Sequence, residues 1–393
     1  MRVGLVVQRF GPDILGGSEF HAYTIARMLA PFVQLTVLTT CARDYRTWEN
    51  VYPQGTSHLD GMEIIRFASE QPRDIAAFND WSDAFFSKQT HSREEEEEYL
   101  KRQGPYVPEL IRYLKTHGER FDAVIFYTYL YYPTAFGLPL VQDKAVLIPT
   151  FHLEPPAGLG IFKRVLPAAH SFIFNTPEEK AAFMDFYGMQ ACRHVVAALP
   201  IDQLVRAHTC DPVVDISPPK RYLLYCGRID AGKGFFEVYD YIKKLRANGL
   251  LGKERFLVTG RGRTESLGPD VDYLGFVSEA AKYLLLRNAL VTLVPSHYES
   301  LSIIALESLY LGTPIIGRAS CLPVKGHITR GRCGALFNDF TSFRGSLVSL
   351  LADRRHRQVL GDRGRRYIDA FYSRDYLVAQ YNRILGAFVS IIR

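Results

Sequence analysis

Two glutamates, Glu299 and Glu307, are separated by seven small or apolar residues in the segment SHYESLSIIALESLYLGTPIIG. The preceding letters, LVTLV, are typical of a strand, and Gly312 is typical of a residue that ends a helix. We therefore predict a loop over PSHYES and a helix that starts near Ser302, with Ser302 as its N-cap. Glu299 then lies in the loop at the carboxyl end of the strand, and Glu307 lies one to two turns into the helix.

The start of this helix could hold an anion between the two carboxylates. The amides of Leu301 and Ser302 would lack helical partners, and the helix dipole places positive partial charge there. One carboxylate could then accept hydrogen bonds from hydroxyls on one side of the anion, and the other from hydroxyls on the opposite side. A nucleotide-sugar, in which a diphosphate joins a sugar to a ribose, has this layout. The alternative is that both glutamates are exposed on a surface helix.

A basic loop follows an earlier strand in the segment YCGRIDAGKGFFEV, residues 225–238. Its glycines permit tight turns, and it carries Arg228 and Lys233 five residues apart. An arginine offers a planar fork to phosphate oxygens, and a lysine offers a mobile point charge. Together they could neutralise a diphosphate. The alternative is that both are surface cations in an ordinary βα loop.

A glycine pair, Gly16–Gly17, joins the first predicted strand to a helix for which Ser18 is the expected cap. Such a pair lets backbone amides approach a phosphate. The pair is not part of a G-x-G-x-x-G motif, and TGRGRTES at residues 259–266 lacks the third glycine. A dinucleotide site is therefore not predicted.

The composition restricts the function classes. The chain has 393 residues, which is too long for one ordinary core, so two domains are expected. A net charge of +6 without a Lys/Arg-rich run argues against nucleic acid and fits an anionic ligand or contact with an acidic membrane surface. The six cysteines form no C-x-x-C pair, so zinc is not expected. Without a signal peptide, their scatter indicates the cytoplasm.

Two acidic patterns have a plain interpretation. The run from Glu94 to Glu98 is predicted to be a solvated helix face. Asp270 and Asp272 form a D-x-D string, which could be taken for a metal motif, but it precedes a short strand far from the glutamates of the predicted site. We therefore predict no metal.

Short β-branched runs alternate with helical patterns, which is the signature of parallel α/β sheets. Residues 1–199 are predicted to form one Rossmann-like doubly wound domain with a helical insertion at about 73–120, and residues 200–370 a second one, after a loop-like stretch at 199–220. Residues 371–393 have apolar residues at helical spacing and are predicted to form a helix that packs back on the first domain. The predicted strands are 2–8, 34–39, 62–67, 122–127, 145–149, 171–174, 194–198, 221–226, 255–259, 271–274, 290–294, 313–316 and 334–337.

The segments GGSE, GRIDAGKG, VTGRG, YLGFVSE and PSHYESLSIIALESLYLGTPII occur in the order and spacing of retaining glycosyltransferases of family 4. The chain resembles that family over nearly its whole length. Through LTTCARDYRTW and IPTFHLEPP, its first half is also similar to a bacterial subgroup of envelope and exopolysaccharide assembly. The resemblance implies the GT-B fold, in which an acceptor-side domain (1–199) and a nucleotide-sugar-binding domain (200–370) face each other across a cleft. It also implies a metal-independent enzyme without a cofactor.

The resemblance assigns roles to individual residues of the donor site. It implies that Arg228 and Lys233 bind the diphosphate, that Glu307 holds the ribose hydroxyls and that Glu299 holds the donor sugar near the reacting face. His152 matches a family histidine near the donor sugar, although the usual acidic neighbour is shifted by one place to Glu154. The catalytic set is then Glu299, His152, Arg228 and Lys233.

Backbone groups complete the implied donor site. They supply contacts to the diphosphate and to the base, and they belong to Gly16, Gly17, Ser300, Leu301, Ser302, Gly275, Phe276 and Val277. For the acceptor, the aromatic run FYTYLYYPTAFG suggests that Tyr127, Tyr129 and Tyr131 stack on or hydrogen-bond to a sugar. The alternative is that these rings pack in the core.

We therefore predict a glycosyltransferase that moves a hexose from a nucleoside-diphosphate sugar to a glycan or lipid-linked saccharide. A UDP donor, with glucose or a close relative as the sugar, is favoured, and GDP-mannose is the next choice. A UDP-sugar 2-epimerase of the same fold and a nucleotide-sugar binding protein without turnover are the alternatives. The enzyme is expected in the cytoplasm, with peripheral contact to the inner face of the membrane left open.

Overall fold

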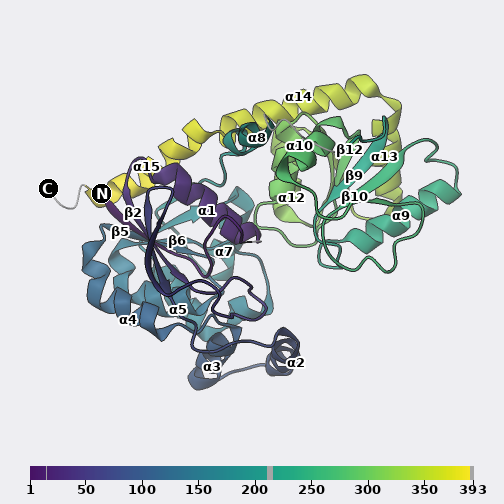
Figure 1. Ribbon diagram of the computed structural model, residues 1–393. Helices are drawn as coiled ribbons and strands as arrows, with labels where there is room; N and C mark the ends of the chain where they lie inside the picture. Colours follow the sequence, from purple (N-terminus) through teal and green to yellow (C-terminus); the bar gives the residue numbers. More distant parts are fainter. Residues whose placement is uncertain (15, 210–215, 390–393) are drawn as a thin grey trace. The chain divides into compact units, whose positions relative to one another are not determined.

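The computed structural model describes residues 1–14, 16–209 and 216–389, which divide into two compact units. Unit 1 comprises residues 1–199 and 378–393, and unit 2 comprises residues 200–377. Each unit has its own twisted sheet with helices on both faces (Figure 1). No helix in the described ranges combines the length and hydropathy needed to cross a membrane.

The sheet of unit 1 has the strand order β3-β4-β2-β1-β5-β6-β7-β8 in the described part of the chain. All neighbouring pairs are parallel except β3 and β4. Strand β3 was not predicted, because its sequence GTSHL is almost wholly exposed and lacks the apolar alternation of a half-buried strand. The strands are β1 Arg2–Val6, β2 Gln34–Thr40, β3 Gly55–Leu59, β4 Met62–Phe67, β5 Ala123–Tyr127, β6 Ala145–Ile148, β7 Ser171–Phe174 and β8 His194–Val196.

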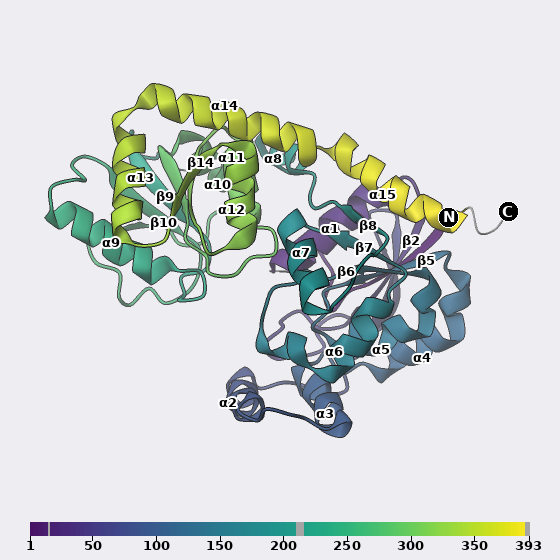
Figure 2. The same ribbon diagram turned by 180° about the vertical axis from the view of Figure 1, so that it is seen from behind.

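The helices of unit 1 form two layers. Helices α4 and α5 lie on one face of the sheet, and α1 and α15 lie on the other (Figures 1 and 2). The helices are α1 Gly17–Leu29, α2 Ile75–Phe86, α3 Arg93–Gln103, α4 Pro108–His117, α5 Tyr132–Gly137, α6 Gly160–Val165, α7 Pro177–Phe186 and α15 Arg374–Val389, with short 3₁₀ turns at Gly118–Arg120, Leu138–Lys144, Pro155–Gly158 and Leu166–Ala168.

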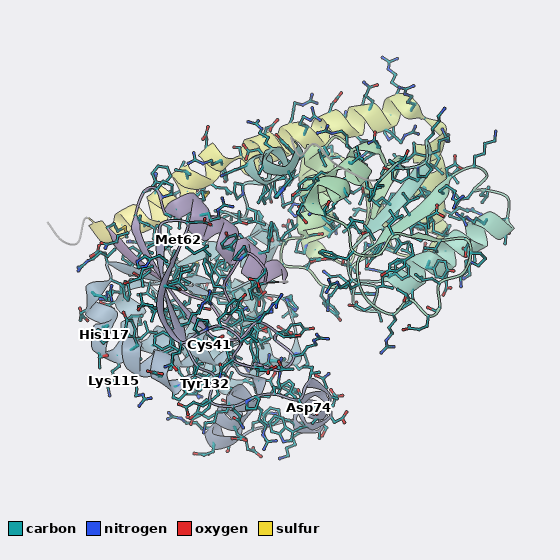
Figure 3. All side chains as sticks on the ribbon, in the orientation of Figure 1. Cys41, Met62, Asp74, Lys115, His117 and Tyr132 are labelled. Carbon is teal, nitrogen blue, oxygen red and sulfur yellow. The ribbon has the colours of Figure 1, made fainter. Side chains whose placement is uncertain are left out.

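The predicted helical segment 73–120 contains α2, α3 and α4. Figure 3 labels Asp74 at its start, where the carboxylate caps α2 by accepting from the amides of Ala76 and Ala77. The acidic run that follows, Glu94 to Glu98, was predicted to be a solvated helix face, and this prediction is wrong for one of its residues. Glu96 is buried, because its two carboxylate oxygens accept the amides of Gly160 and Ile161 at the start of α6, at 2.5 and 2.8 Å.

Unit 2 has the strand order β11-β10-β9-β12-β13-β14, in which every described pair is parallel. Helix α14 packs across α11 and α12 (Figure 2). The strands are β9 Tyr222–Cys226, β10 Arg255–Thr259, β11 Asp272–Tyr273, β12 Val291–Val294, β13 Ile315–Arg318 and β14 Gly334–Phe337. The helices are α8 Ile201–Thr209, α9 Phe235–Ala247, α10 Glu279–Asn288, α11 Ile303–Tyr310, α12 Leu322–Gly331, α13 Phe340–Ala352 and α14 Arg354–Phe371.

Helix α8 corrects the loop predicted at 199–220. Its residues Ile201 and Val205 are buried, and the helix packs on α10 and α11. The prolines and aspartates that suggested a loop stand mostly after it. Cys210 lies outside the described residues. The division between the units falls between Leu199 and Pro200, and again between Leu377 and Val378 within α15.

Candidate active site

Two loops of unit 2 meet because of the strand order. Strand β9 lies between β10 and β12, so the chain leaves β9 toward one side of the sheet and later returns on the other. In open parallel sheets, such a switch point opens a crevice at the carboxyl ends of the strands, where ligands bind. The loop after β9 (residues 227–234, the basic loop) and the loop after β12 (residues 295–302, the glutamate loop) both start at this place.

The basic loop and the glutamate loop are joined by backbone contacts. The amide of His297 donates to the carbonyl of Gly232 at 3.1 Å. Gly234 has φ of 66°, and a side chain there would come within 2.2 Å of the carbonyl oxygen of Pro295. Glycine is therefore required at position 234 both by its left-handed backbone and by this close approach.

Two of the predicted site residues, Lys233 and Glu299, lie together at this junction. The Lys233 ammonium is 2.7 Å from Oε1 of Glu299, and both side chains are largely shielded, at 26% and 14% exposure. Arg228 is different: its side chain is 66% exposed, and its guanidinium lies 3.4 Å from Asp230. The sequence analysis missed Asp230, which also accepts the amide of Lys233 at 2.7 Å and so fixes the turn that presents the lysine.

The start of α11 differs from its predicted form. Ser302 occupies the N-cap position, but its φ of 67° is left-handed and its side chain caps nothing. Its hydroxyl is buried and has no hydrogen-bond partner within the described residues. Nor do the amides of Leu301, Ser302 and Ile303 have an acceptor there. These donors remain available for an anion, in a backbone conformation that is uncommon for a residue other than glycine.

Glu307 lies further along α11, in a buried charged group that this helix forms with the neighbouring helix α10. Its Oε1 is 2.9 Å from the Lys282 ammonium and accepts from the Tyr283 hydroxyl at 3.1 Å. Lys282 also contacts Glu279 at 2.7 Å. Burial raises the pKa of Glu307, and the charge of Lys282 opposes that rise. Burial alone would lower the pKa of Lys282, but the carboxylates of Glu307 and Glu279 outweigh it and raise that pKa.

The sequence analysis did not single out Lys282. The signal was present: Ser278 caps α10, and Glu279 and Lys282 stand three residues apart in its first turn. What the sequence could not supply was the packing of α10 beside α11, which brings Lys282 to Glu307.

The predicted base-binding turn, Gly275 to Val277, is tied to the loop after β10. The carbonyl of Gly275 accepts from the amide of Gly260 at 2.9 Å and from the Thr259 hydroxyl at 2.7 Å. The Phe276 ring is 60% exposed, and the Arg261 guanidinium lies 4.8 Å from its centroid. An exposed ring with an adjacent cation is suited to stacking on an aromatic base.

Two buried side chains that sequence reasoning missed hold the glutamate loop in place. The Nε2 of His327 donates to the carbonyl of Leu301 at 2.7 Å, while its Nδ1 is 3.0 Å from the Tyr367 hydroxyl of α14. Arg318, at the end of β13, donates to the carbonyl of Pro295 at 2.8 Å and pairs with Glu237. Burial lowers the pKa of His327 to about 4, so the neutral ring donates to Leu301 at physiological pH.

In unit 1, the glycine pair lies at the start of α1. Gly16 is the N-cap residue, and a side chain there would come within 2.3 Å of Glu19, whereas the space beside Gly17 is open. Ser18 is inside the helix and donates to Glu19 at 2.8 Å, so it is not the cap that was predicted. Glu19 is itself buried in an ion pair with Arg9 at 2.5 Å, which anchors the turn.

His152 follows β6 and lies beside the shifted acidic residue. Its Nε2 is 3.5 Å from Glu154, which also accepts from the Tyr129 hydroxyl at 2.6 Å. Burial alone would lower the pKa of His152, but the hydrogen bond and charge of Glu154 outweigh it and raise that pKa. The one-residue shift of the acidic partner therefore does not prevent the pairing.

The tyrosines proposed for the acceptor are placed mainly by packing. Tyr127 and Tyr129 are each 1% exposed, and the ring of Tyr129 packs against Phe151 and Phe162. Neither ring offers a face to a sugar, which corrects the prediction for these two residues. Tyr131 is partly exposed, with its ring edge-on to that of Trp48. The rings of Tyr127 and Tyr129 are buried because they belong to β5 and to the turn after it, and β5 is a central strand of the sheet.

Residues 211–367 match the family model for glycosyl transferases group 1. A GDP-mannose-dependent alpha-(1-6)-phosphatidylinositol dimannoside mannosyltransferase of Mycobacterium tuberculosis is 32% identical over 114 residues, which are 27% of this chain and 29% of that protein. A D-inositol 3-phosphate glycosyltransferase of Geodermatophilus obscurus is 26% identical over 275 residues, covering 63% of this chain and 60% of that protein. The matches thus span less than two thirds of these relatives.

The comparison with solved structures extends over both units. Sucrose-phosphate synthase from Thermosynechococcus elongatus matches with a TM-score of 0.71 at 16% identity, covering 99% of each chain. The chain has the GT-B fold. The two Rossmann-like sheets of this GT-B chain are therefore as the sequence predicted.

In the described part of the GT-B chain, no group of three or more His, Cys, Asp or Glu side chains is arranged to hold a metal ion. Asp272 of the D-x-D string pairs with Arg255. The Asp270 carboxylate accepts from the Tyr239 hydroxyl and lies 3.8 Å from the Arg246 guanidinium, which donates to the Asp270 backbone carbonyl. Both aspartates are thus engaged in ion pairs within unit 2.

The buried carboxyl of Glu179, in the first turn of α7, should make the stability of the fold depend on pH. It accepts the amides of Phe151 and Asn175, each at 2.5 Å, and so anchors the loop that carries His152. Burial raises the pKa of Glu179 from 4.5 to about 8. At a pH between these two values, the folded chain keeps a proton on Glu179 that the unfolded chain has released. Stability should therefore fall as pH rises through this window, by about 1.4 kcal/mol per pH unit.

Urea unfolding between pH 5 and 8 measures this effect. The variant Glu179→Gln cannot titrate and should lose this component of the slope. Asp185→Asn, an exposed carboxylate on the same helix, serves as the control and should keep the parental slope. An unchanged slope in Glu179→Gln would mean that this carboxyl does not titrate in the window.

Proposed function

We propose that this chain is a glycosyltransferase that moves a hexose from a nucleoside-diphosphate sugar to a glycan or lipid-linked saccharide. The observation that carries the proposal is the junction at the carboxyl ends of β9 and β12. There, the Lys233 ammonium lies beside the Glu299 carboxylate and near the unpaired amides that begin α11. A cation and free amides suit a diphosphate, and a carboxylate suits sugar hydroxyls.

Each residue has a role in this proposal. Lys233 and the exposed Arg228 neutralise the diphosphate, and the amides of Leu301 and Ser302 bind its oxygens. Glu307, which Lys282 holds in place, accepts hydrogen bonds from the ribose hydroxyls. Glu299 does the same for the donor sugar. The assignment of Gly17 and His152, which belong to unit 1, to the same ligand follows from the family resemblance.

The reaction breaks the bond between the anomeric carbon and the diphosphate oxygen and forms a bond from that carbon to an acceptor hydroxyl oxygen. The transition state carries positive charge on the sugar and growing negative charge on the departing diphosphate. Lys233, Arg228 and the amides stabilise that negative charge. A departing phosphate oxygen takes the hydroxyl proton. Same-face attack, which retains the anomeric configuration, and independence of metal are proposed from the resemblance.

For the donor we propose UDP-glucose or a close relative, with GDP-mannose as the alternative. The printed name of the mycobacterial relative specifies GDP-mannose, which is why the two are tested side by side. In either case the exposed Phe276 ring is proposed to stack on the base, and backbone groups of Gly275 and Val277 to contact its edge. Synthesis of an envelope polysaccharide or exopolysaccharide on the cytoplasmic face of a membrane is the proposed setting.

Thermal unfolding with a panel of UDP, GDP, ADP and their hexose conjugates tests the proposal. A ligand at one hundred times its Kd should stabilise the folded state by about 2.7 kcal/mol and raise the melting temperature. The responding nucleotide identifies the donor. If no nucleotide raises the melting temperature, the proposal is wrong.

Measurements of turnover distinguish the proposed glycosyltransferase from two rival functions. An NMR time course with the responding donor alone should show slow hydrolysis at most. Conversion of UDP-N-acetylglucosamine to its 2-epimer without an acceptor would instead identify an epimerase. Binding without turnover against a panel of lipid-linked and free saccharides would favour a nucleotide-sugar binding protein.

A further inference from the structure

Unit 1 has a cavity at one edge of its sheet. Its volume is about 590 Å³, and it is lined by His170, Cys192, Arg193, His194, Arg383, Ile384 and Ala387. His170 directly precedes β7 and Arg193 directly precedes β8, so the cavity lies at the amino ends of these strands. His152 follows the carboxyl end of β6. Because the strands are parallel, the cavity and His152 are at opposite edges of the sheet.

The lining of this cavity, here called the α15 pocket, is basic. Two arginines and two histidines converge from the β7 and β8 edge and from α15, and no carboxylate is among the lining residues. Neither Arg193 nor Arg383 forms an ion pair within the described ranges, in contrast to Arg2, Arg9 and Arg120 of the same unit. Among the described residues, the acid whose charge raises the pKa of His170 is Asp143, which lies outside the lining.

The pocket has features of a built site as well as charge. The His194 ring is oriented by donation from Nδ1 to the Cys192 carbonyl at 2.9 Å. The ring of His170 lies 4.7 Å from that of Phe388, a buried residue on α15, and its Nδ1 is 3.1 Å from the Ser171 hydroxyl. Both imidazoles are thus held by neighbours from the strands and the helix. The volume is in the range of small-molecule sites.

We propose that the α15 pocket binds a phosphoryl group, carried by a phosphorylated small molecule or by a lipid head group. Guanidinium forks bind phosphate oxygens in pairs, and histidines add donors. An anion between Arg193 and Arg383 would remove the repulsion between the two cations and link β8 to α15. Occupancy therefore fastens the C-terminal helix to the sheet of unit 1.

Hydrogen exchange of the full-length protein tests this proposal independently of the donor site. Inorganic phosphate at ten times its Kd should slow exchange of the α15 amides, residues 378–389, by about tenfold when exchange follows release of the helix. The same protection is expected from phosphatidylglycerol vesicles if the group is a lipid head group, and not from phosphatidylcholine vesicles. Protection at residues 295–302 reports the donor site separately.

Variants localise the effect. Arg193→Ala and Arg383→Ala should each abolish the protection of α15 while leaving protection at residues 295–302 unchanged. Arg112→Ala, an exposed arginine on α4, is the matched control and should behave as the parent. Protection by phosphate in solution supports a soluble ligand, and protection by anionic vesicles alone supports a head group. Absence of protection in the parent protein, or equal protection in both pocket variants, overturns the proposal.

Discussion

Replacing Lys233 with alanine should lower kcat/KM for sugar transfer by about 100-fold or more. The substitution removes a fixed positive charge from the place where the departing diphosphate gains negative charge, and such losses typically cost this much. The effect should fall mainly on kcat, because the charge matters most in the transition state. The turn should persist, because Asp230 binds the backbone amide of residue 233 and not its side chain. Initial rates over a range of donor concentrations measure both constants.

Two further variants control this experiment. Lys253→Ala removes an exposed lysine elsewhere in unit 2 and should leave both constants unchanged. Lys233→Arg restores the charge with a different shape and should recover part of the loss. If Lys233→Ala turns over as fast as the parent protein, the role assigned to this lysine is wrong.

Replacing Lys282 with methionine should weaken both the fold and donor binding. The variant leaves the Glu307 carboxylate buried without a cation, and breaking such a pair typically costs about 3–5 kcal/mol of stability. Because burial raises the pKa of Glu307 and only Lys282 opposes it strongly, that pKa should rise further in the variant. A carboxyl with a raised folded pKa loses stability as pH increases, so the deficit should be smallest in acid.

Donor affinity should follow the opposite trend in this variant. Glu307 must be ionised to accept two ribose hydroxyls. Because its pKa should be higher in Lys282→Met than in the parent, the affinity of the variant should improve more steeply than that of the parent as pH rises toward 8. Calorimetric titration of the nucleotide at several pH values checks this, and urea unfolding checks the stability. A pH-independent affinity equal to that of the parent would contradict the role of Lys282.

The double variant Lys282→Met/Glu307→Gln separates the two effects. It removes both charges and keeps an acceptor for the Tyr283 hydroxyl, so most of the lost stability should return. Donor affinity should stay low, because the ribose would still lack its carboxylate. Recovery of both properties would show that Glu307 is a structural group only.

The sequence by itself determined the strands and the loops that follow them. Buried parallel strands are continuous β-branched runs, so β9 and β12 were visible, and the glycines of the basic loop marked the turns. Once the strands are known, parallel pairing places their carboxyl ends at one edge, and the proximity of Lys233 and Glu299 follows. The edge strand β3 was invisible because an exposed strand has no apolar pattern.

Only the tertiary structure decided which polar groups are paired and which rings are buried. Glu307 meets Lys282, and Leu301 meets His327, because separate helices pack beside α11, and no local pattern encodes such contacts. Packing also took Tyr129 out of solvent and gave Ser302 a left-handed backbone instead of a cap. The α15 pocket unites positions 170, 193 and 383, which are remote along the chain. Local physics sets periodicity and turns, whereas ion pairs and burial depend on neighbours that only the folded chain supplies.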